Sequence, residues 1–221
     1  MDAPIYLDNN ATTRVDPAVV EAMLPFFTEH FGNASSIHAF GSEVGKALKK
    51  ARSQVQELLG AEHDSEIIFT SCGTESDSTA ILSALKAQPD CNTVITTTVE
   101  HPAVLNQCEW LEKDGYIVHK LRVDKKGRVD LDEYKSLLHE RVAVVSVMWA
   151  NNETGTLFPV LEMAELAAAK GIMFHTDAVQ AVGKIPIDLK SSKIDMLSLS
   201  GHKLHAPKGI GVLYLRRGCR F

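Results

Sequence analysis

The feature that most limits the fold of this chain is a regular alternation of apolar runs with amphipathic segments between residues 66 and 215. The apolar runs are short and rich in β-branched residues, and the segments between them place apolar side chains three or four positions apart. Strands that alternate with helices form a mostly parallel sheet, which the helices cover on both faces. The pattern therefore predicts an α/β fold of three layers.

The individual elements follow from the periodicity and from the residues that start or stop a helix. The predicted strands cover residues 5–7, 66–71, 93–99, 116–121, 142–149, 172–176, 195–199 and 211–215. The predicted helices cover residues 16–27, 41–60, 75–86, 103–113, 130–138 and 159–170. An N-terminal segment, 1–15, is expected to precede one large domain, 16–221.

Composition favours a protein that handles a small metabolite. The 221 residues are 45% hydrophobic and carry a net charge of -5 without a basic block, so neither nucleic acid nor an anionic membrane is an expected partner. The longest apolar run, 142–150, is much shorter than the roughly 20 residues of a membrane span, and a cytoplasmic protein is predicted. The spacing of the four cysteines predicts free thiols, at Cys72, Cys91, Cys108 and Cys219.

The loop that contains Lys203 combines a lysine with groups that suit a phosphate, namely Ser200, Gly201 and His202. A lysine amine that is held near a carbonyl and kept partly unprotonated can form a Schiff base, as the lysine partners of pyridoxal phosphate do. A lysine in a loop rich in Gly and Pro is more often a solvated charge. The loop alone leaves both interpretations open.

Ligands of parallel sheets bind outside the carboxyl ends of the strands, so the residues there are candidates for a site. Gly73 and Thr74 follow the strand 66–71, where free helix N–H groups and a hydroxyl suit a phosphate, although Thr74 and Asp77 also fit a capping box. His101 follows the strand 93–99. It could stack on an aromatic ring or move protons, or it could be structural.

Two further candidates follow later strands. Asn152 lies in the segment Asn151–Gly155, where asparagines suit a turn and could equally donate hydrogen bonds to a phenolate oxygen. Asp177 ends an apolar strand with no basic neighbour in the sequence, and a protonated pyridine nitrogen would offset the cost of burying its carboxylate. The alternative for Asp177 is a helix N-cap. Gln180 shares a face with Asp177 if the chain turns helically.

A metal site is a different possibility, since His202 and His205 have HxxH spacing and His175 could join them. Pro207 and Gly209 disfavour the helix that such a site would need. No cysteine or glutamate lies at ligand spacing. No metal site is predicted.

Several short motifs resemble a known family when they are taken together. They are YLDNNATT at 6–13, GTESD at 73–77, EH at 100–101, NNE at 151–153, DAVQ at 177–180 and SGHK at 200–203. They closely resemble the class V aminotransferase-like family and, within it, the NifS-type cysteine desulfurases, the group associated with iron–sulfur cluster supply for nitrogenase. The resemblance extends over all 221 residues.

The resemblance implies a type I pyridoxal-phosphate fold and a homodimer. It implies removal of sulfur from L-cysteine, which leaves L-alanine and an enzyme persulfide, with an iron–sulfur scaffold protein as sulfur acceptor. Lys203 would carry the Schiff base of pyridoxal phosphate and move a proton between Cα and C4′, and His101 would stack on the ring. Asp177 would pair with the ring nitrogen, and Asn152 and Gln180 would form hydrogen bonds near the phenolate oxygen. The phosphate would be held by Gly73, Thr74, Ser200 and His202.

The chain departs from the family pattern in its cysteines. The family's persulfide cysteine lies on a mobile loop in a C-terminal part beyond residue 221, and none of the four cysteines occupies that motif. Cys72 is expected to be a packing residue, and the large domain is expected to be incomplete at its C-terminus. The alternatives are a selenocysteine lyase, another class V aminotransferase, or an inactive truncated protein that binds the cofactor.

Overall fold

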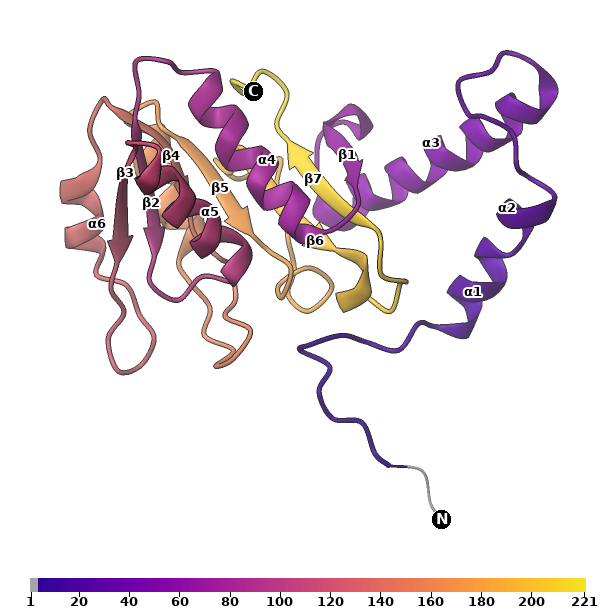
Figure 1. The fold of residues 1–221 in the computed structure, drawn as a ribbon, viewed down its shortest axis with the longest axis horizontal. Coiled ribbons are helices and arrows are strands. Elements are labelled where there is room, and N and C mark those ends of the chain that lie inside the picture. Colours follow the sequence, from indigo (N-terminus) through magenta and orange to yellow (C-terminus); the bar gives the residue numbers. More distant parts are fainter. Residues whose placement is uncertain (1–3) are drawn as a thin grey trace.

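A computed structural model describes residues 4–221 and shows one sheet between two layers of helices (Figure 1). The seven strands lie in the order β1-β7-β6-β5-β4-β2-β3. Their bounds are β1 Ile67–Thr70, β2 Thr93–Thr97, β3 Ile117–Leu121, β4 Val142–Ser146, β5 Met173–Asp177, β6 Met196–Ser200 and β7 Gly211–Leu215. The helices are α1 Pro17–Met23, α2 Pro25–Thr28, α3 Ala39–Leu59, α4 Gly73–Lys86, α5 Pro102–Lys113, α6 Leu131–Leu137 and α7 Val160–Ala168.

The sheet is mostly parallel, as predicted. Strands β2 to β6 pair in parallel, whereas β7 is antiparallel to both of its neighbours, β6 and β1. Two antiparallel neighbours need no crossover helix between them, and the loop of residues 201–210 joins β6 directly to β7. The reversal of β7 was not predicted, because its apolar sequence is equally compatible with either direction.

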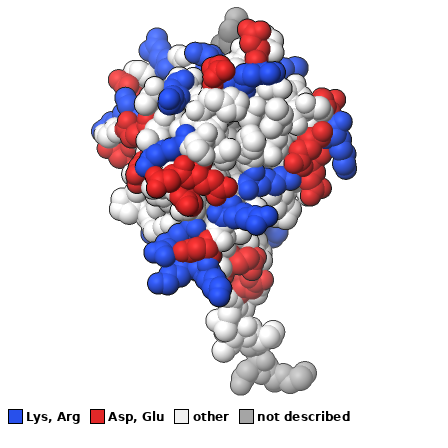
Figure 2. Space-filling model, turned by 90° about the vertical axis from the view of Figure 1, so that its left-hand side faces the viewer, with Lys and Arg blue, Asp and Glu red and all other residues white. Residues whose placement is uncertain are grey.

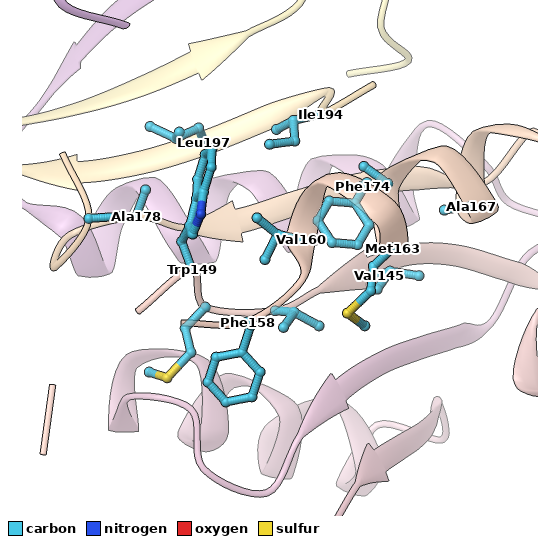
Figure 3. Packing of buried hydrophobic residues seen from close by; sticks show 14 of the residues in the cluster. Val145, Trp149, Phe158, Val160, Met163, Ala167, Phe174, Ala178, Ile194 and Leu197 are labelled. Atoms are coloured by element: carbon cyan, nitrogen blue, oxygen red, sulfur yellow. The ribbon is translucent and has the colours of Figure 1, made fainter. Parts of the chain in front are cut away.

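Each face of the sheet packs against its own group of helices. On one face α4 and α5 bury side chains such as Ile81 and Cys108 against the strands. On the other face α7, α6 and the end of α3 surround a larger cluster, in which Met163, Phe174 and Trp149 are buried (Figure 3). Complete burial of one such side chain contributes roughly 1.5 to 3 kcal/mol, so the two clusters stabilise the three layers.

The N-terminal helices differ from the prediction of one helix over residues 16–27. Asp16 caps α1, with its Oδ1 accepting a hydrogen bond from the N–H of Ala18 at 2.8 Å. The helix is interrupted at Leu24, because Pro25 lacks an N–H group and begins the short helix α2. The prediction for α3 is confirmed, since Gly60 ends it with a φ of 59°.

The predicted strand 5–7 is wrong. Residues 4–7 have no strand partner, and the side chains of Ile5 and Leu7 are 84% and 86% exposed. The N-terminal segment is attached to the lysine loop at Thr13, whose N–H donates to the carbonyl of His202 at 2.9 Å. Residues 1–3 lie outside the described residues, and the division into a segment 1–15 and a domain 16–221 stays a prediction.

The first three helices and the segment that joins α2 to α3 expose much apolar surface. Neither α1 nor α2 buries a residue, and α3 projects from the β1 edge of the sheet with α1 and α2 near its far end (Figure 1). Exposed fractions reach 71% at Phe27, 69% at Phe31 and 60% at Phe40.

The charged side chains are mixed in sign on the face that Figure 2 shows, where lysines and arginines alternate with aspartates and glutamates. A surface of this kind lacks the single-sign field that attracts a polyanion. A search of residues 4–221 finds no helix with the length and apolar character that a membrane crossing requires.

The buried position of α7 yields a matched test of the core. Met163→Ala should lower the free energy of unfolding by about 2 to 5 kcal/mol, because the side chain is fully buried and its loss leaves a cavity. Leu161→Ala, on the same helix but 51% exposed, should change it by less than about 1 kcal/mol. Urea unfolding followed by circular dichroism measures both. Equal losses would show that α7 does not pack as described.

Candidate functional site

A cavity of about 540 Å³ lies at the carboxyl ends of the parallel strands. Asp177 is the last residue of β5, Ser200 is the last residue of β6, and His101 follows β2. The parallel arrangement brings together side chains that are far apart in the sequence. All nine residues predicted from the sequence line this cavity: Gly73, Thr74, His101, Asn152, Asp177, Gln180, Ser200, His202 and Lys203.

Lys203 ends the short turn η2, Gly201–Lys203, which directly follows β6. Its Nζ donates hydrogen bonds to the carbonyl oxygens of Asn10 and Ala11, the latter at 2.8 Å. Desolvation and then the positive charge of Lys184 lower the pKa of this lysine. A larger fraction of the amine is therefore uncharged near neutral pH, which nucleophilic attack on a carbonyl requires.

Asp177 is a buried carboxylate at the floor of the cavity, only 6% exposed. Desolvation raises its pKa, while a hydrogen bond from the N–H of Val179 at 2.9 Å and the charges of His101 and Lys203 act in the opposite direction. No ion pair to Asp177 is found within residues 4–221. The carboxylate is thus available to a cationic group in the cavity.

The helix N-cap alternative for Asp177 is wrong. Residues 179–184 form a series of turns, so no helix follows the carboxylate. Gln180 lies in these turns and does not share a helical face with Asp177. It nevertheless reaches the cavity, where its Nε2 donates to the carbonyl of Asn10 at 2.9 Å.

The turn after β1 brings the start of α4 to the cavity. The helix begins at Gly73 with Cys72 as its N-cap, so Thr74 and Asp77 do not form the capping box that the sequence allows. A Cβ on Gly73 would lie 3.0 Å from Val179 Cγ2, which explains the glycine by close packing. The first N–H groups of the helix have no partner within it, and together with the Thr74 hydroxyl they suit an anion.

Cys72 also lines the cavity and is only partly buried, so the expectation that it is a packing residue is wrong. The structure puts it at the helix start because β1 ends at Thr70. All four cysteines of the chain are free thiols.

Ser200 and His202 form the wall between the start of α4 and Lys203. Ser200 is buried, and the Nδ1 of His202 lies 3.1 Å from the hydroxyl of Thr12. Desolvation, followed by the positive charges of Lys203 and Lys208, lowers the pKa of His202. Its imidazole therefore carries less positive charge near neutral pH than a free histidine.

His101 has a structural role in addition to its place in the cavity. Its Nδ1 accepts a hydrogen bond from the N–H of Ala103 at 3.1 Å and so caps α5. The cap uses Nδ1 as an acceptor and leaves Nε2 free for another contact. The two interpretations of this histidine are therefore compatible, because the capping contact uses only one ring nitrogen.

The sequence left two roles open for the paired asparagines, the turn and a ligand contact, and each role belongs to a different residue. Asn151 maintains the turn, since its Oδ1 accepts from the N–H groups of Glu153 and Thr154, both at 3.0 Å. Asn152 lines the cavity and donates from Nδ2 to Glu153 Oε1 at 2.7 Å. Only the second asparagine is placed to contact a ligand.

Sequence reasoning missed the N-terminal segment as part of the site. Asp8, Asn10 and Ala11 line the cavity, and the main-chain carbonyls of the latter two hold Lys203. The polar side chains of residues 8–13 are typical of a turn. Nothing in its periodicity indicated that it crosses the lysine loop, because that contact spans the whole chain.

Asp77 was also missed, although it lies in a motif that the sequence singled out. It is 1% exposed, lines the cavity, and has an Oδ1 without a hydrogen-bond partner within the described residues. That oxygen is 3.6 Å from His175 Nε2, and the two ring nitrogens are each 2.9 Å from a serine hydroxyl, Ser146 and Ser198. Burial lowers the pKa of His175 to about 3, so the ring is neutral.

Three buried carboxyl groups thus lie close together, Asp77 and Asp177 in the lining of the cavity and Glu100 beneath it, and desolvation disfavours the ionised form of each. Glu100 accepts hydrogen bonds from the Thr97 hydroxyl and the Met148 N–H, yet burial raises its pKa to about 8. Desolvation and then the charge of Asp177 raise the pKa of Asp77 well above its usual value. Because its Oδ1 has no hydrogen-bond partner among the described residues, Asp77 favours the neutral form more than an exposed aspartate does.

The metal alternative finds no support in the geometry. His175 lies in the core between Ser146 and Ser198, and His205 has a φ of 59° outside any helix. Across the described part of the chain, no group of three or more His, Cys, Asp or Glu side chains could hold a metal ion.

Residues 5–220 match the model of a protein family described as aminotransferase class-V. The match covers almost the whole chain and includes every residue of the cavity named above. The chain belongs to the class-V aminotransferase family.

Among curated relatives, the chain is 77% identical over 219 residues to "Cysteine desulfurase NifS" of Azotobacter vinelandii, which covers 99% of this chain and 54% of that protein. It is 62% identical over 219 residues to a cysteine desulfurase of Sinorhizobium fredii, covering 99% of this chain and 57% of that protein. The chain spans about half the length of the curated relatives it matches.

Two solved structures are also similar. One, described as a NifS-like protein, has a TM-score of 0.94 and 42% identity over 98% of this chain and 60% of its own. The other, "SspA in complex with cysteine", has a TM-score of 0.92 and 38% identity over 96% of this chain and 61% of its own. The predicted α/β fold is thereby confirmed as that of NifS-like structures.

The raised pKa of Asp77 can be tested by stability. A raised folded pKa means that the native state holds the proton more tightly than the unfolded chain, so the wild-type protein loses stability as the pH rises from the unfolded pKa toward the folded one. Asp77→Asn removes this loss. Relative to the wild type, the free energy of unfolding of this variant should therefore increase by up to about 1.4 kcal/mol per pH unit as the pH rises above about 4, the ordinary pKa of an aspartate.

Urea unfolding of the cofactor-free protein across this pH range measures the gain. Cys72, Glu100, Asp177 and His175 face Asp77 and are present in both proteins, so the difference isolates residue 77. The exposed Asp90→Asn is the control and should follow the wild type. Parallel curves for Asp77→Asn and the wild type would show that Asp77 is ionised throughout.

Proposed function

We propose that this protein is a pyridoxal-phosphate-dependent cysteine desulfurase that takes sulfur from L-cysteine and leaves L-alanine and an enzyme persulfide. The observation that carries the proposal is the joint position of Lys203 and Asp177 in one cavity. The pKa of the lysine amine is lowered, and the buried carboxylate forms no ion pair within residues 4–221. The similarity to cysteine desulfurases supports the choice of substrate.

The residues present fit the cofactor. When bound, pyridoxal phosphate supplies an aldehyde and an electron-accepting pyridine ring. Lys203 would hold it covalently and later carry a proton on Nζ, and Asp177 would pair with the ring nitrogen and keep it protonated. The uncommitted N–H groups at the start of α4 fit its phosphate, together with Gly73, Thr74, Ser200 and His202.

The remaining side chains orient the ring and the substrate. His101 would stack on the ring and assist proton transfer with the nitrogen that does not cap α5. Asn152 and Gln180 would donate hydrogen bonds near the phenolate oxygen. The burial of Asp177 strengthens its contact with a cationic group, because charges interact more strongly where water is excluded.

The partner and location proposals follow from the same assignment. We propose an iron–sulfur scaffold protein as the sulfur acceptor, in the supply of clusters to nitrogenase. The free cysteines fit a reducing compartment, and we place the protein in the cytoplasm. None of the four cysteines of this chain is proposed as the persulfide carrier.

The lysine assignment predicts the loss of cofactor binding. The wild-type protein mixed with pyridoxal phosphate should develop a visible absorption band that Lys203→Ala abolishes, because the amine that binds the aldehyde is gone. Lys208→Ala, an exposed lysine of the same loop, should retain the band. A band of equal strength in Lys203→Ala would contradict the assignment.

The same samples incubated with L-cysteine separate the possible activities. With added dithiothreitol, whose thiols accept the sulfur as a persulfide and then reduce it to sulfide, alanine and sulfide from the wild-type protein, and none from Lys203→Ala, support a desulfurase. Alanine formed only from L-selenocysteine would indicate a selenocysteine lyase. Transfer of the amino group would indicate another class V aminotransferase. Cofactor binding without any alanine would indicate a protein that binds the cofactor and lacks the activity.

We also propose that the protein forms a homodimer, because the aromatic side chains of α2 and of the segment that precedes α3 are exposed. Light scattering should give the mass of two chains for the wild type. Phe31→Glu should reduce it to one chain, since a charge in an apolar interface is costly to bury. Leu161→Glu on α7 should remain dimeric, and a single-chain mass for the wild type would refute the proposal.

A further inference from the structure

A line of hydrogen bonds connects Lys203 to a second lysine, Lys184, that is exposed and does not line the cavity. Lys184 Nζ donates to Gln180 Oε1 at 2.5 Å, and Gln180 Nε2 donates to the carbonyl of Asn10 at 2.9 Å. The same carbonyl accepts a hydrogen bond from Lys203 Nζ. One side-chain amide and one main-chain carbonyl therefore separate the two ammonium groups.

This arrangement selects the orientation of the Gln180 amide. A glutamine side chain can present either its carbonyl oxygen or its NH₂ group in a given direction. A lysine ammonium has three donors and no acceptor, so Lys184 can hold only Oε1. A half-turn of the amide would place NH₂ against the ammonium and remove a donor from Asn10. Each hydrogen bond lost in this way shifts the equilibrium between the two orientations about two- to tenfold.

Lys184 also acts on Lys203 through its charge. Desolvation lowers the pKa of Lys184, and desolvation followed by the charge of Lys184 lowers the pKa of Lys203. Asp8 and Asp177 face Lys203 as well and oppose this effect. A neighbouring cation is a known means of keeping a nucleophilic lysine partly uncharged.

We propose that Lys184 is a positioning residue, which fixes the Gln180 amide with its NH₂ group toward the cavity and keeps a second positive charge close to Lys203. The inference rests on the proposed function, in which Gln180 donates to the phenolate oxygen of the cofactor. A donor in that place attracts an anionic oxygen, whereas the amide carbonyl in the reversed orientation would repel it.

The test is Lys184→Met, which removes both the donor and the charge from an exposed position and leaves the core intact. Affinity for pyridoxal phosphate, titrated by visible absorption, should fall about three- to tenfold through the freed amide. The rate of cofactor loading should fall about threefold at neutral pH, since Lys203 loses a neighbouring cation and becomes more often charged. The rates should converge at high pH, where Lys203 is uncharged in both proteins.

Three controls give the result its meaning. Lys184→Arg keeps a cation with donors only and should restore both affinity and rate. Lys170→Met, exposed just beyond α7, should match the wild type. In a Gln180→Ala background, Lys184→Met should cause no further loss of affinity, because the amide through which it acts is absent.

The outcomes distinguish this inference from the proposed function. If the wild type loads the cofactor through Lys203, and Lys184→Met loads it with the same affinity and rate at every pH, the role of Lys184 is overturned and the proposed function is not. An equal loss of affinity with and without the Gln180 side chain would also overturn it. Failure of the wild type to load at all would instead remove the proposed function on which it rests.

Discussion

The geometry of the site depends on one constraint, that parallel strands end at the same edge of their sheet. Strands β2, β4, β5 and β6 share a direction, and the residue that ends or follows each of them faces the same space. Because helices cover both faces, that edge is also where the chain is free to form loops and still remain partly shielded from water. The same topology therefore brings the side chains of the site together and shields them from water.

Desolvation acts on several buried or half-buried groups of the site in the direction of lower charge. It lowers the pKa of Lys203 and of His175, and it raises the pKa of Asp177. Burial therefore disfavours the charged form of each of these three side chains. Each charge that remains is weakly screened, so a single neighbour such as Lys184 alters the state of a reactive group more than it would on an open surface.

Sequence predicted the parts of the site that follow from strand ends, and it missed the parts that depend on distant contacts. Asp177 and Lys203 stood out because periodicity located the strands before them. Asn10 gave no such signal, since its carbonyl becomes important only when residues 200–205 lie beside it. The sequence also allowed Asp77 to belong to a capping box with Thr74, because a sequence pattern cannot show that the helix starts two residues earlier and turns the carboxyl inward. The reversed β7 escaped prediction for a related reason, as strand direction is a tertiary property.

The pairing of β6 with β7 has a consequence for how the pocket assembles. Ser200 is paired with Gly211, and the N–H of Gly201 donates to the carbonyl of Ile210, so the reactive lysine lies in a short loop closed at its base. Closing a short loop costs less chain entropy than closing a long one, and local contacts form fast. The lysine loop and Asp177 are close in sequence, whereas the start of α4 and the N-terminal segment must arrive from far away. Folding is thus expected to build the amine and its carboxylate early and to complete the anion-binding wall last.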